Sequence, residues 1–214
     1  MNRQVIIDDT AIPEGVTRIA DQLVGPDDLH PGDIVTLRFK HAFLYMTGLV
    51  LLAAWRKSLP ATVQVIVDDS AASPETQRYL TNTGFREVIE TGIFHPSVPS
   101  RIGKVPIQAI LRGREKEATV NEIVRIFDDY AGQVRDTSPF RVLLSELCQN
   151  VLSHSELTTP GYICARVLET NNKCEIAIAD TGMGSTKVFD EERTCPLSIE
   201  CAKERVPSQS RWKA

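Results

Sequence analysis

The most informative stretch of the chain is FRVLLSELCQNVLSHS, residues 140–155. It follows Ser138-Pro139, a pair typical of a helix start. Its apolar residues recur at the three- and four-residue spacing of an α-helix. They predict a buried helix face made of Val142, Leu143, Leu147, Val151 and Leu152. We therefore expect a long amphipathic helix here.

Three polar side chains share a second stripe of this helix. Glu146, Asn150 and His154 follow one another at intervals of four residues, which places them on one face. An amide oxygen is a hard ligand suited to Mg²⁺, a carboxylate can order or deprotonate water, and an imidazole can donate a hydrogen bond to phosphate. The stripe could serve a magnesium–triphosphate site, but such stripes are also typical of solvent-exposed helix faces.

The residues that follow predict a β-hairpin ending in a glycine-containing turn. Gly161–Leu168 and Cys174–Ala179 have strand character and are separated by a short polar segment. Asp180 stands directly after the second strand, where its carboxylate could accept a hydrogen bond from an adenine amino group. Gly182 and Gly184 let the backbone approach a base closely and turn sharply.

The order of these elements resembles that of the GHKL ATPases, the superfamily of gyrase, the related heat-shock chaperones, histidine kinases and the MutL mismatch-repair protein. The resemblance covers residues 105–214, with an N box that contains Glu146 and Asn150 and a G1 box from Asp180 to Gly184. It implies a partial Bergerat-type α/β sandwich that binds ATP and Mg²⁺.

The resemblance also implies roles for the N-box residues. Asn150 matches the Mg²⁺ ligand, and Glu146 matches the general base of the branches that hydrolyse ATP. His154 matches the position one turn further on, which faces phosphate.

In the G1 box, Asp180 matches the aspartate that reads adenine, and Gly182 and Gly184 match the glycines of the motif. The family has a glycine-rich G2 box further on, which covers the phosphates, whereas residues 185–214 contain no glycine. We therefore expect either a piece of a longer protein or a degenerate ATPase, with weak or no ATP turnover.

The first hundred residues predict an α/β layer structure of their own. Gln4–Ile7, Asp33–Phe39 and Val63–Val67 have strand character, and Pro13–Val24 and Leu49–Lys57 have helical spacing. The uncharged run from Ala42 to Trp55 is too short to span a bilayer and predicts a buried core helix.

The end of this half is predicted to contain one more helix and one more strand. Ser73-Pro74 is typical of a capped helix start, and Gly84 ends that helix. Phe85–Ile89 is predicted to return to a strand. Residues 91–104 hold glycines and prolines that break every periodicity, so we predict two domains, 1–100 and 105–214.

The first domain is similar to STAS domains at one helix start, Tyr45-Met46-Thr47-Gly48-Leu49. The serine that is phosphorylated in the antagonist branch of that family is absent, and only the hydroxyl of Thr47 remains. A phosphorylation switch on this half is therefore not expected.

The composition narrows the function classes. The formal net charge is −4 and neither half is basic, which disfavours nucleic-acid binding. The first ten residues are no signal peptide, so we expect a cytoplasmic protein without a membrane partner. The five cysteines form no CxxC pair, which predicts reduced thiols and no zinc site.

These observations predict an ATP-binding regulatory protein of the GHKL type with a protein partner, and they leave a homodimer open. It would be an ATPase or protein kinase only if the full-length protein completes the site. Residues 105–153 contain no histidine, so a histidine kinase is disfavoured. The alternative is a non-enzymatic interaction scaffold with a degenerate nucleotide site.

Overall fold

The computed structural model describes residues 2–8, 13–40, 45–92, 104–110, 112–131, 136–154, 161–168 and 173–180. Within these residues the chain has a mixed α/β fold with two three-stranded sheets. The α/β class expected from the sequence is confirmed.

The first half of the chain builds a parallel sheet in the order β1-β2-β3. Its elements are β1 (Asn2–Ile7), α1 (Pro13–Gln22), β2 (Ile34–Phe39), α2 (Met46–Ser58), β3 (Gln64–Asp68), α3 (Pro74–Asn82) and α4 (Phe85–Thr91), with a short 3-10 helix at Pro26–Asp28. The three strands and the helices α1 and α2 agree with the sequence-based expectation to within a few residues.

The second half builds an antiparallel sheet in the order β4-β5-β6, with two helices that precede the β5–β6 hairpin. Its elements are β4 (Lys104–Ile110), α5 (Arg114–Ala131), α6 (Ser138–His154), β5 (Gly161–Leu168) and β6 (Lys173–Ala179). The predicted hairpin and the predicted long helix are therefore confirmed.

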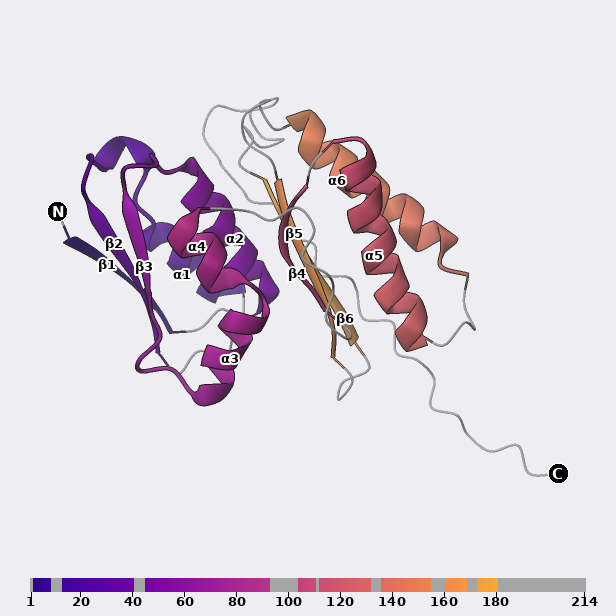
Figure 1. Cartoon of the computed structure of the whole chain (residues 1–214), viewed down its shortest axis with the longest axis horizontal. Coiled ribbons are helices and arrows are strands. Elements are labelled where there is room, and N and C mark those ends of the chain that lie inside the picture. Colours follow the sequence, from indigo (N-terminus) through magenta and orange to yellow (C-terminus); the bar gives the residue numbers. More distant parts are fainter. Residues whose placement is uncertain are drawn as a thin grey trace.

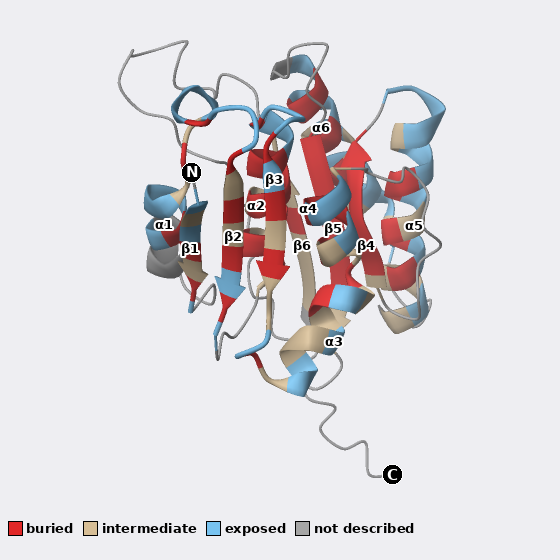
Figure 2. Cartoon of the chain, turned by 60° about the vertical axis from the view of Figure 1, so that its left-hand side comes forward, coloured by how far each residue is buried: buried red, intermediate tan, exposed pale blue. Residues whose placement is uncertain are grey.

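The elements stack in layers, as Figure 1 shows. Helices α2, α3 and α4 lie between the two sheets, and α5 and α6 cover the other face of the second sheet. The buried strand residues, which Figure 2 colours red, run through the middle of the molecule. The second sheet is thus covered by helices on both faces.

One hydrophobic core joins the two halves. It contains Val35 and Leu37 of β2 and Leu49 of α2 together with Tyr162 of β5 and Ala177 of β6. The predicted domain boundary falls between α4 and β4, and residues 93–103 lie outside the described residues. The division into two domains stays a prediction, but the apolar packing continues across it.

The segment predicted as a strand at Phe85–Ile89 is a helix. Phe85, Val88 and Ile89 are the buried residues of α4, and their three- and four-residue spacing is helical. Gly84 has a φ of +70°, so it ends α3 and begins α4 in a conformation that suits glycine. Arg86 and Glu90 add an ion pair one turn apart.

The capped start of α3 is confirmed. The Ser73 hydroxyl accepts a hydrogen bond from the backbone N–H of Thr76 at 3.2 Å, and Pro74 is the first helical residue. This arrangement satisfies one of the free N–H groups of the first turn.

Candidate functional site

Helix α6 carries the predicted polar stripe, and its first turn is fixed by a side chain that precedes it. The Asp136 carboxylate accepts a hydrogen bond from the backbone N–H of Ser138 at 3.0 Å. Hydrogen bonds from the Ser138 side chain and backbone lower the pKa of Asp136. The capping oxygen thus comes from Asp136, although the sequence suggested Ser138.

The buried face of α6 differs from the predicted one. Its fully or largely buried residues are Leu144, Cys148, Val151 and Leu152. Val142 and Leu143, predicted to be buried, are 61% and 52% exposed, and that part of the prediction is wrong. The face of α6 that contains Cys148 packs against the neighbouring elements. Cys148 acts there as a small apolar residue.

Two residues of the predicted polar stripe lie on the solvent-exposed side of α6. Glu146 and Asn150 are both exposed, on the same side as Val142 and Leu143. His154 is the last residue of the helix. The side chains of Glu146 and Asn150 are therefore accessible to a ligand and take no part in the core.

Gly161 brings the end of α6 to the hairpin. A β-carbon at Gly161 would lie 2.0 Å from Cγ1 of Val151 and 3.1 Å from the carbonyl oxygen of Ala179. Only glycine allows the last turns of α6, the start of β5 and the end of β6 to approach this closely. Asn150 and Asp180, neighbours of Val151 and Ala179 in the chain, consequently belong to the same end of the structure.

Asp180 directly follows β6 and is half-buried. On β6, Ala177 and Ala179 belong to the core shared with α2, whereas Ile176 and Ile178 pack against the cluster formed by α5 and α6. Because side chains alternate along a strand, we expect Asp180, the first residue after β6, to face the α6 side if the pleat continues by one residue. The predicted Gly182 and Gly184 lie outside the described residues.

A polar cluster that the sequence analysis missed lies on the opposite face of the same hairpin. Arg166 of β5 and Glu175 of β6 are paired in register, and their side chains are only 10% and 15% exposed. The Glu175 carboxylate also accepts a hydrogen bond from the backbone N–H of Met46, at the start of α2. The available signal was one arginine and one glutamate inside two otherwise mostly apolar strands.

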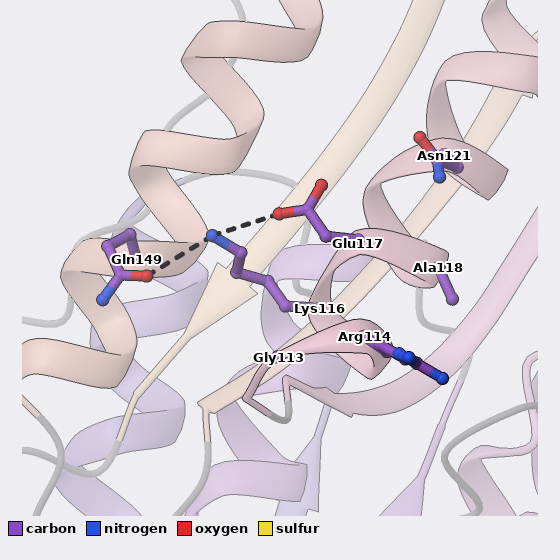
Figure 3. Close-up of a pocket in the computed structure, with 7 residues that line it drawn as sticks. All are labelled: Gly113, Arg114, Lys116, Glu117, Ala118, Asn121 and Gln149. Carbon is purple, nitrogen blue, oxygen red and sulfur yellow. Dashed lines mark hydrogen bonds and ion pairs between the residues drawn. The ribbon is translucent and has the colours of Figure 1, made fainter.

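A shallow pocket of 590 Å³ lies between the start of α5 and the middle of α6, as Figure 3 shows. The side chain of Lys116, on α5, extends towards α6. Its Nζ atom lies 3.3 Å from Oε1 of Gln149 and 3.4 Å from Oε1 of Glu117. The residues that line the pocket are Gly113, Arg114, Lys116, Glu117, Ala118, Asn121 and Gln149. Of the predicted site residues that the structure describes, none lines this pocket.

The described residues contain no group of three or more His, Cys, Asp or Glu side chains that could hold a metal ion by themselves. Cys148 and Cys164 are buried cysteines that form no disulfide. Burial raises the pKa of Cys148 to about 11 and also raises the pKa of Cys164, so both are poor nucleophiles at neutral pH.

No helix in the described part of the chain combines the length and the apolar character needed to cross a bilayer. Comparison of the chain with family models, with curated proteins and with solved structures gave no match.

Proposed function

We propose that this chain binds Mg-ATP between the exposed side of α6 and the end of β6, as a cytoplasmic regulatory protein of the GHKL type. The observation that supports it best is the junction at Gly161, where Val151 of α6 and the carbonyl group of Ala179 approach within van der Waals range of one glycine. This junction puts the predicted metal ligand Asn150 and the predicted adenine acceptor Asp180 at one end of the hairpin.

The exposed groups suit this ligand chemically. The Asn150 amide oxygen would hold Mg²⁺ and the Glu146 carboxylate would orient a water molecule, since oxygen ligands are those that Mg²⁺ prefers. His154 would face the phosphates, and Asp180 would accept a hydrogen bond from the adenine amino group. The bound magnesium would neutralise phosphate charge and support phosphoryl transfer.

We propose weak or no turnover for residues 1–214, because residues 185–214 contain no glycine, whereas a glycine-rich segment supplies backbone N–H groups to the phosphates in the resembled family. ATPase or protein kinase activity would need that segment from a longer protein. The STAS-like first half would provide the contact with a regulatory protein partner.

A non-enzymatic scaffold is the second candidate function. It is favoured by the exposure of Val142 and Leu143 beside Glu146 and Asn150. Apolar side chains among polar ones on an open helix face are typical of a surface that binds another protein.

Thermal unfolding with and without Mg-ATP tests the proposed function. A ligand at 100 times its dissociation constant adds about 2.7 kcal/mol to the free energy of unfolding, which for a chain of this size raises the Tm by roughly 5–10 °C. Asp180→Asn should lose most of this shift, since an amide is a poorer acceptor for the adenine amino group.

Asp129→Asn provides a matched control, because Asp129 lies on the outer surface of α5 in an exposed ion pair with Arg125. It should keep the full Mg-ATP shift. A wild-type Tm unmoved by Mg-ATP would favour the scaffold, and an equal shift in Asp180→Asn and wild type would remove Asp180 from the site.

A further inference from the structure

The start of α2 is capped by a residue from the other half of the chain. Tyr45 is at the N-cap position, but its side chain makes no capping hydrogen bond. Oε1 of Glu175 instead accepts a hydrogen bond from the backbone N–H of Met46 at 2.8 Å. A carboxylate at this position satisfies a free N–H group and interacts favourably with the helix dipole.

Glu175 is held in place by a second partner. Its Oε2 atom lies 2.6 Å from Nε and 2.5 Å from Nη2 of Arg166. One carboxylate oxygen thus contacts two guanidinium nitrogens, in an ion pair with little exposure to solvent. The Arg166 guanidinium in turn lies 4.8 Å from the ring centre of Tyr79 on α3. Glu175 therefore links β5, β6 and α2, with α3 reached through Arg166.

The same strand continues from this cluster to the proposed nucleotide site. Glu175 is paired in register with Arg166, and Ala179, next to Asp180, is paired with Tyr162. Ala177 and Ala179 pack in the core shared with α2. The β5–β6 pair is thus in contact with the α2 layer at both its ends.

We propose that Glu175 is a positioning residue that couples the capping of α2 to nucleotide binding at the end of β6. This inference rests on the proposed function, because it assigns the regulation of that same site. Coupling between two sites is reciprocal in free energy. Nucleotide binding should therefore strengthen the cap on α2, and loss of the cap should weaken nucleotide binding.

Two measurements test this coupling. Mass spectrometry follows hydrogen–deuterium exchange in the first turn of α2, with and without a non-hydrolysable Mg-ATP analogue. Calorimetric titration gives the dissociation constant of the same analogue. In wild type, the analogue should slow exchange in the peptide that contains Met46. In Glu175→Gln, the dissociation constant should rise roughly 5-fold or more, and bound analogue should no longer slow exchange there.

Glu122→Gln makes the same chemical change in an exposed ion pair with Arg125 on α5 and should behave as wild type. The exchange measurement on wild type needs no variant, so it tests the coupling even if Glu175→Gln fails to fold. Analogue that binds to wild type without changing exchange in α2 would overturn the coupling and leave the proposed function standing. A Glu175→Gln variant that binds the analogue with the dissociation constant of wild type, and in which the analogue still slows exchange in α2, would also overturn the coupling and leave the proposed function standing. Absence of binding to wild type would instead remove the proposed function, and the coupling with it.

Discussion

At the scale of single residues, one polar cluster lies between the two halves of the chain. Arg166 and Glu175 satisfy each other, and Glu175 also satisfies a helix N–H group. Their neighbour Tyr79 contributes its ring to Arg166, whereas its hydroxyl oxygen is buried and makes no hydrogen bond within the described part of the chain. Burial raises the pKa of this phenol far above its ordinary value, so it stays neutral.

Tyr79→Phe should therefore stabilise the protein. The substitution removes a buried hydroxyl that has lost its water without gaining a partner, and it keeps the ring below Arg166. We expect the free energy of unfolding to rise by about 1 kcal/mol in a urea titration. Tyr79→Leu, which removes the ring as well, should lower it. If the Tyr79→Phe variant were less stable than wild type, the hydroxyl would have a partner after all.

At the scale of elements, the approach of α6 to the hairpin depends on one glycine. Gly161→Ala would place a methyl group against Cγ1 of Val151 and close to the carbonyl oxygen of Ala179. We expect a loss of about 1–3 kcal/mol in the free energy of unfolding, because the backbones must separate. Val151→Ala in the same chain should restore part of the loss.

Gly25→Ala is the control for this substitution. The nearest atom to its added β-carbon would be Oδ2 of Asp28 at 3.6 Å, an ordinary contact, and the φ of Gly25 is −66°. The stability of this variant should differ little from that of wild type. A Gly161→Ala variant as stable as wild type would show that α6 and the hairpin are not in such close contact.

The elements also show what the sequence could and could not predict. Long periodic segments such as Ser138–His154 and the β5–β6 hairpin were predictable, because spacing over many residues separates a helix from a strand. Phe85–Ile89 was not, since a short apolar segment fits either element. The buried face of α6 was misplaced because it was predicted to contain Val142 and Leu143, whereas Leu144 and Cys148 lie on the buried stripe.

The candidate site was predictable only in part. The four-residue spacing of Glu146 and Asn150 gives their common side of α6, and the structure places both on an exposed surface. Arg166 and Glu175 escaped prediction because their meaning depends on strand pairing and on α2, whose Met46 is distant in sequence. No local pattern encodes such a contact.

At the scale of the whole molecule, the helix layer between the sheets makes the two halves share their core. Helix α2 is buried around most of its circumference, from Met46 and Leu49 to Trp55, as is typical of a helix enclosed on several sides. The sequence predicted this helix to be buried. It did not reveal that the second sheet supplies the cover, since either half could have enclosed α2 alone.

Photolabelling with 8-azido-ATP and Mg²⁺, followed by peptide mapping, tests the proposed nucleotide site most directly. Because the label forms where adenine binds, we expect adducts in the peptide that contains Asp180. Excess unlabelled ATP should suppress these adducts, and Asp180→Asn should reduce them. Adducts confined to the first sheet, or labelling that excess ATP does not suppress, would contradict a nucleotide site between α6 and the end of β6.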